Sequence, residues 1–163
     1  MMISQKMNDA LNDQINAEQY SSHLYLAMAA AFEKMNLKVF AQRFYMQAEE
    51  ETTHAMKFFK YIVDQGGDVC LKQINAPEGK FDSVKDIITE ARDHEIKVTK
   101  MINSLAELAE KEKDYATRSF LQWFIDEQVE EVASMEELLA LVEMAGPKQM
   151  LYLESRLYRM MQK

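Results

Sequence analysis

Residues that interrupt helices are scarce in this chain, which has only four glycines and two prolines among 163 residues. Both prolines lie outside the long stretches in which apolar residues recur at helical spacing. Alanine, leucine, methionine, glutamate and lysine are frequent, and they favour helix throughout. A chain of this length can bury a substantial core within one domain. We therefore expect residues 1–163 to form a single all-α domain.

Cysteine and positive charge are also scarce. Cys70 is the only cysteine, so an intrachain disulfide is excluded and a reducing compartment is expected. No apolar run is long enough to span a bilayer and no signal-peptide core follows the N-terminus, so we expect a soluble, cytoplasmic protein without a membrane partner. The net charge of −8 argues against nucleic-acid binding and is compatible with attraction of cations.

Helical periodicity divides the chain into four long stretches and a short one. Two-to-three-residue turns join the first stretch to the second and the third to the fourth, so each pair forms an antiparallel hairpin. Residues 66–82 have no helical period and are long enough to run the length of the bundle, so the third helix runs parallel to the second. This pattern predicts a four-helix bundle with one long crossover and a short C-terminal fifth helix. The helices are expected at about 4–34, 37–65, 83–110, 114–145 and 148–162.

Each of the four long stretches carries a polar residue where its apolar stripe predicts a core position. These residues are Glu18, Glu51, Glu95 and Gln128. The first two are 33 positions apart, as are the last two, and in each hairpin both members are equally far from the turn. They are therefore expected to lie at one height. Because a buried carboxylate without partners is very costly, a matched set of this kind predicts one cation site on a pseudo-twofold axis.

A histidine accompanies the acid of the second stretch. His54 follows Glu51 by three residues and projects from nearly the same helix face. Carboxylate and imidazole at this spacing can hold one metal ion, although a lone Glu-x-x-His is usually a solvated surface pair. The offset of 77 that relates Glu18 to Glu95 relates His54 to Glu131, so the second half has a carboxylate in place of the imidazole.

Several aromatic and histidine residues near these positions have less specific interpretations. Tyr25 is seven residues after Glu18 on the same stripe, and a hydrogen-bonded core phenol is favoured over an electron donor. Trp123 is interpreted in the same way. His23 and His94 are interpreted as surface residues or as residues that pack behind the ligands.

The helical arrangement and four segments together resemble the non-haem bacterial ferritins over essentially the whole chain. The segments are 16–20, 25–29, 47–55 and 120–124 leading into 127–131. The resemblance implies an iron-storage protein with a ferroxidase centre, which oxidises iron(II) with dioxygen or hydrogen peroxide and deposits ferric oxyhydroxide inside a hollow shell. The apolar face of the fifth helix, which has little core left to join, is expected to contact other subunits of a 24-subunit homo-oligomer.

The resemblance also implies roles for individual residues. Glu18, Glu51 and His54 would bind the first iron. Glu51 would bridge to the second iron, held by Glu95 with Gln128 or Glu131 nearby. A third iron position beside the pair would involve four acids, of which Glu50 and Glu127 share the offset of 77. These acids are Glu50, Glu127, Glu130 and Glu131.

The sequence departs from that of the haem-containing bacterioferritins, whose site is symmetric, with Glu-x-x-His in both halves. Here the second half has Gln128 and Glu131 at those places. No haem is therefore expected, although Met46 and Met56 on the second helix leave haem binding open.

Other classes of helical protein are less consistent with the sequence. A rubrerythrin needs four cysteines for its iron module, and one cysteine excludes it. A di-iron oxygenase needs a substrate cavity, whereas the apolar stripes look filled. A metal-free scaffold has no reason to place four polar residues level in one core. A miniature ferritin of the Dps kind has its ligands between subunits and lacks the fifth helix.

Overall fold

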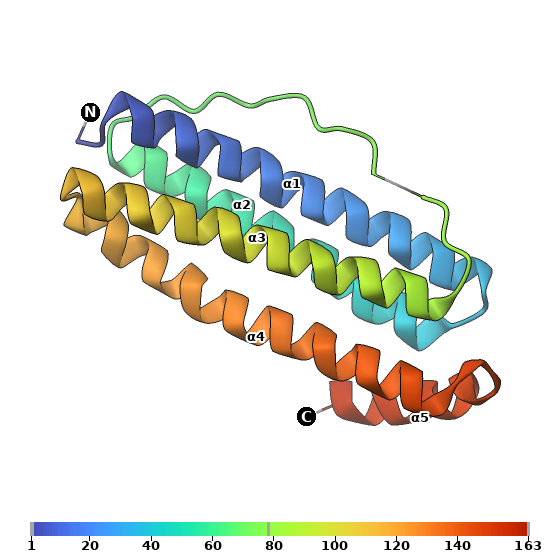
Figure 1. Ribbon diagram of the computed structural model, residues 1–163. Coiled ribbons are helices and arrows are strands. Elements are labelled where there is room, and N and C mark those ends of the chain that lie inside the picture. Colours follow the sequence, from blue (N-terminus) through green and yellow to red (C-terminus); the bar gives the residue numbers. More distant parts are fainter. Residues whose placement is uncertain (1, 78, 163) are drawn as a thin grey trace.

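The computed structural model describes residues 2–77 and 79–162, and these residues are helical apart from turns, caps and one long connection. Four long helices pack side by side, and a short fifth helix lies against one end (Figure 1). The predicted all-α four-helix bundle with a long crossover is confirmed. The helices are α1 (Gln5–Lys34), α2 (Lys38–Asp64), α3 (Val84–Glu112), α4 (Tyr115–Ala145) and α5 (Met150–Met161), with a 3₁₀ turn at Pro147–Gln149 before α5.

Side-chain caps define the beginnings of three helices. Ser4, Ser83 and Asp114 each accept a hydrogen bond from a backbone N–H of the following first turn, which satisfies a donor that the helix leaves unpaired. Two tight turns reverse the chain, and each has a residue in the left-handed region, with φ of 59° at Asn36 and 56° at Lys113. These turns make α1–α2 and α3–α4 antiparallel hairpins.

The crossover between α2 and α3 runs along the outside of the bundle from one end to the other (Figure 1). Buried asparagines of α1 hold its first part. Asn8 and Asn12 both donate to the carbonyl of Asp68, and Asn12 accepts from the backbone N–H of Cys70 at 2.6 Å. An irregular segment needs such partners because it has no ladder of its own. One residue of this segment, 78, lies outside the described part of the chain.

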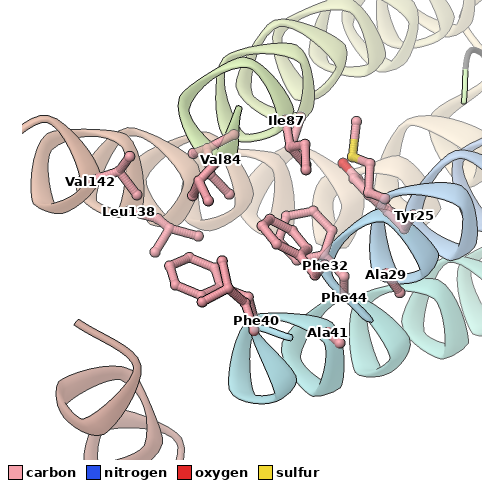
Figure 2. Packing of buried hydrophobic residues seen from close by; sticks show 14 of the residues in the cluster. Tyr25, Ala29, Phe32, Phe40, Ala41, Phe44, Val84, Ile87, Leu138 and Val142 are labelled. Carbon is pink, nitrogen blue, oxygen red and sulfur yellow. The ribbon is translucent and has the colours of Figure 1, made fainter. Parts of the chain in front are cut away.

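The apolar core consists of two clusters. One fills the end of the bundle nearest the α1–α2 turn and includes Phe32, Phe40 and Phe44, as Figure 2 shows. The other fills the opposite end and includes Phe58 and Phe124, whose rings stack with centroids 4.1 Å apart. In each long helix the predicted polar position falls between the residues of the two clusters. The core is thus interrupted by one polar layer.

Helix α5 is attached to the bundle of its own chain. Leu153 and Leu157 are buried in the cluster that includes Phe32, and Glu154 accepts hydrogen bonds from the backbone N–H groups of Val39 and Phe40. This carboxylate caps α2, which has no cap from its own sequence. The expectation that the fifth helix has little core left to join is wrong, because Met150, Leu153 and Leu157 are buried in the core of their own chain. Contact of this helix with other subunits stays a prediction.

The exposed face of α5 carries a different set of large side chains, Leu151, Tyr152 and Tyr158. Among the described residues, no helix combines the length and the apolar character that crossing a membrane requires.

Candidate metal centre

Four helices each contribute one side chain to the polar layer. Glu18 of α1, Glu51 of α2, Glu95 of α3 and Gln128 of α4 are all less than 5% exposed. Each helix turns this residue inward because it continues the stripe of buried positions on that helix. The three carboxylates of the layer are shielded from solvent, so the groups in contact with them decide whether they are stable as anions.

Glu18, Glu51 and His54 form the tightest group of potential ligands. One ligand atom from each lies within 4.8 Å of the others, and all three side chains are buried. His54 Nδ1 is 3.3 Å from Glu51 Oε2. The imidazole is oriented by edge-on contacts with the rings of Trp123 and Phe124, at centroid distances of 5.3 and 5.9 Å. Two carboxylates and one nitrogen at these distances can surround a single divalent ion.

The carboxylate of Glu18 tests whether a cation fits here. Gln14 donates to its Oε1 at 2.8 Å, but its Oε2 is buried and no N–H or O–H group of the described residues donates to it. Burial, and then the charge of Glu51, raise the pKa of Glu18 well above its ordinary value. Facing carboxylates without a donor between them need a cation or a shared proton. The donor set therefore fits a metal ion.

The α3–α4 half of the layer is already hydrogen-bonded. The phenol of Tyr25 donates to Glu95 Oε1, and Gln128 Nε2 donates to Glu95 Oε2 at 3.0 Å. Burial raises the pKa of Glu95, and both hydrogen bonds oppose that shift. Burial, and then Glu95, also raise the pKa of Tyr25 well above its ordinary value, so the phenol keeps its proton. In this half, both oxygens of the Glu95 carboxylate are thus oriented by hydrogen bonds, unlike those of Glu18.

Glu131 lies beside the same layer, on the turn of α4 that follows Gln128. Gln47 donates to Glu131 Oε2 at 2.8 Å and more weakly to Glu51 Oε1 at 3.3 Å, so one amide joins two carboxylates of different helices. Burial, and then the charge of Glu95, raise the pKa of Glu131 to about 8. Metal binding would therefore displace protons from this site at neutral pH.

A second group of potential ligands lies at the edge of the layer. Glu50, His54 and Glu127 have ligand atoms within 4.8 Å of one another, and Glu50 is exposed. His54 belongs to both groups and joins them. Among the described residues, neither group of potential ligands includes Glu130 or Glu131. Glu131 accepts a hydrogen bond from Gln47, and Glu130 is exposed. The structure thus brings Glu50 and Glu127 together beside His54 and leaves Glu130 out of this group.

Comparisons with known proteins agree with this geometry. Residues 8–145 match the ferritin family, described as a ferritin-like domain. The chain belongs to the ferritin family. It is 42% identical over 135 residues to a bacterial non-heme ferritin of Staphylococcus aureus, covering 83% of this chain and 81% of the relative. The bacterial non-heme ferritin of Staphylococcus haemolyticus is also 42% identical over 135 residues, with the same coverage.

Solved structures give the same result for the whole chain. An open-pore ferritin from the archaeon Archaeoglobus fulgidus superimposes with a TM-score of 0.93 at 42% identity, covering 96% of both chains. A humanized archaeal ferritin superimposes with a TM-score of 0.93 at 42% identity, covering 95% of both chains. The resemblance to ferritins predicted from the sequence is confirmed.

The remaining aromatic and histidine residues of this ferritin lie in different surroundings. Tyr25 is a buried, hydrogen-bonded phenol in contact with Glu95. Trp123 is 40% exposed, so its interpretation as a core residue is wrong. His94 packs against the Tyr25 ring and bonds to Ser21, and burial lowers its pKa to about 4. His23 is exposed.

Sequence reasoning missed the amides that orient the acids of this ferritin. Gln14 precedes Glu18 by four residues, and Gln47 precedes Glu51 by four, so each amide reaches the carboxylate one turn later. The two glutamines are separated by the same 33 positions as the two acids, and that repeat could have identified them. The exposed Met46 and Met56 lie on the outer face of α2, away from the layer.

Proposed function

We propose that this chain is a non-haem iron store of the cytoplasm. It oxidises iron(II) to iron(III) at an intrasubunit di-iron ferroxidase centre and deposits the product as ferric oxyhydroxide inside a hollow shell. The observation that carries the proposal is the buried group of Glu18, Glu51 and His54, in which Oε2 of Glu18 receives no hydrogen bond from the described residues. The identity of 42% with bacterial non-heme ferritins supports it.

Iron(II) is the substrate, and the chain's residues would divide its binding into two unequal places. Glu18, Glu51 and His54 would hold the first ion, and Glu51 and Glu95 the second, with Gln128 and Glu131 beside it. Anionic oxygen ligands favour iron(III) over iron(II), so this environment eases transfer of electrons to dioxygen or hydrogen peroxide. Because nitrogen ligation strengthens binding of first-row divalent ions, the place beside His54 would fill first.

Protons must leave as metal enters. The pKa values of Glu18, Glu51 and Glu95 are raised chiefly by burial, so a cation exchanges with protons held among them. Gln128 is neutral and orients Glu95 without adding a negative charge. Tyr25 keeps its hydroxyl against Glu95, which puts a phenol in direct contact with a ligand and supports a role as an electron donor.

A crystal exposed to iron(II) without oxygen tests the assignment of the ligands directly. Anomalous scattering is expected to show one ion among Glu18, Glu51 and His54 at low loading, and a second beside Glu95 at higher loading. Zinc(II), which has no redox chemistry, serves as a control for binding without oxidation. Iron found only at exposed acids such as Glu49 would contradict the proposed centre.

The shell is expected to contain 24 copies of the chain. Large apolar side chains that remain exposed on α2 and α5, such as Met46, Met56 and Leu151, support burial against other copies. Light scattering of the purified protein is expected to give a mass near 24 times the 19.0 kDa of one chain. A protein that stays monomeric or dimeric at every salt concentration would contradict storage and favour a small redox enzyme.

A further inference from the structure

Lys57 lies at the outer edge of the metal centre, next to His54 and Trp123. It follows His54 by one turn of α2, and its Nζ lies 2.9 Å from the centroid of the Trp123 ring. The same indole contacts the edge of the His54 imidazole at 5.3 Å. An ammonium group over the face of tryptophan is attracted by the negative face of the ring. Lys57 is therefore held at the edge of the polar layer.

The acids of the third metal position act on this lysine. Glu127 follows Trp123 by one turn of α4, and Glu50 precedes Lys57 by two turns of α2, so both acids lie on the helix faces that meet at this ring. Burial lowers the pKa of Lys57, and the charges of Glu127 and Glu50 oppose that shift. These two acids also share a group of potential ligand atoms with His54, all within 4.8 Å. One lysine and one incoming metal ion would thus draw on the same two carboxylates.

We propose that Lys57 is a resident counter-cation of the third metal position and sets its affinity for metal. Without metal, its ammonium group lowers the repulsion between Glu50 and Glu127. With metal, it repels the ion that has taken its place. This inference rests on the proposed function, because it assumes that Glu50, His54 and Glu127 receive a metal ion.

The chemistry of lysine suits this role. Its ammonium is a compact point charge on a flexible stem, so it can withdraw along the Trp123 face without disturbing α2. Lys57 is half-buried, whereas Lys60, one turn further along, is exposed. The consequence for a ferritin is a third position that binds metal weakly and exchanges it quickly, rather than a permanent site.

Replacing Lys57 by methionine tests the proposal, because methionine keeps most of the stem and removes the charge. Terbium(III) is a suitable probe, since Trp123 is the only tryptophan of the chain and sensitises emission from an ion bound nearby. For a trivalent ion about 6 Å from a unit charge, Coulomb repulsion reduced by salt corresponds to an affinity difference of about tenfold. The Lys57→Met variant is therefore expected to bind terbium(III) about tenfold more tightly, with a smaller difference at high salt.

Three variants complete the experiment. Lys57→Arg keeps the charge and is expected to keep the wild-type affinity, as is Lys60→Met, which removes a charge elsewhere on α2. Glu127→Gln is expected to remove the sensitised signal, which assigns that signal to the third position.

The possible outcomes distinguish the proposal from the function on which it rests. Equal or weaker terbium(III) binding by Lys57→Met, with a signal that still depends on Glu127, would overturn the role of Lys57 and leave the metal centre intact. No binding by any variant would overturn both.

Discussion

Replacing Glu51 by alanine is expected to slow rapid iron(II) oxidation by more than about 100-fold, and replacing His54 by alanine should have a similar effect. Glu51 approaches both halves of the layer, since it shares the ligand group of Glu18 and His54, and its pKa is raised by burial and then by the charge of Glu95. Removing it leaves neither metal place complete. The measurement is stopped-flow absorbance of iron(III) after mixing iron(II) with the protein in oxygenated buffer.

The matched control is Glu49→Ala, which removes an exposed acid two residues away on the same helix. It is expected to oxidise iron(II) at the wild-type rate. Far-ultraviolet circular dichroism should show unchanged helix content in all variants, because alanine favours helix and the two apolar clusters are unchanged. Oxidation at the wild-type rate in both Glu51→Ala and His54→Ala would remove the basis for the ferroxidase centre.

The metal-free protein is expected to lose stability as pH rises from about 4.5 to about 8. The pKa of Glu131 is raised from 4.5 to about 8 by burial and by Glu95, so in this range the folded protein holds a proton that the unfolded chain has released. Stability falls with pH wherever the folded state binds more protons. For Glu131 alone the loss of unfolding free energy is about 4–5 kcal/mol across the range.

The Glu131→Gln variant is expected to flatten that pH dependence by the same amount. Glutamine keeps the shape and can still accept the hydrogen bond from Gln47, but it cannot titrate. Urea unfolding of the metal-free protein, at several pH values and one protein concentration, measures the difference. Glu130→Gln, which changes the exposed neighbour, is the control and should retain the wild-type slope. A Glu131→Gln protein with the wild-type slope would show that Glu131 does not titrate in this range.

The polar layer could be predicted from the sequence because its cause is local. Helical spacing places Glu18, Glu51, Glu95 and Gln128 on stripes of core residues, and hairpin symmetry makes each pair level. These two facts need only the pitch of a helix and the position of a turn. The structure accordingly has these side chains buried between two apolar clusters.

The partners of these side chains could not be predicted in the same way. Gln47 of α2 donates a hydrogen bond to Glu131 of α4, and Glu154 of α5 caps the first turn of α2. Trp123 faces outward rather than into the core, and the ammonium group of Lys57 lies over its ring. Each contact depends on how far apart the helix axes lie and how they cross, which many side chains decide together.

The sequence alone therefore determined the all-α class, the crossover, and the level at which acid and imidazole enter the core, because periodicity within one helix carries that information. Only the tertiary structure decided which carboxylates face each other without a donor, which are already hydrogen-bonded, and where α5 docks. The physical reason is that hydrogen bonds and charge interactions act over a few ångströms between residues up to 115 positions apart. Their pairing is set by the packing of the whole bundle.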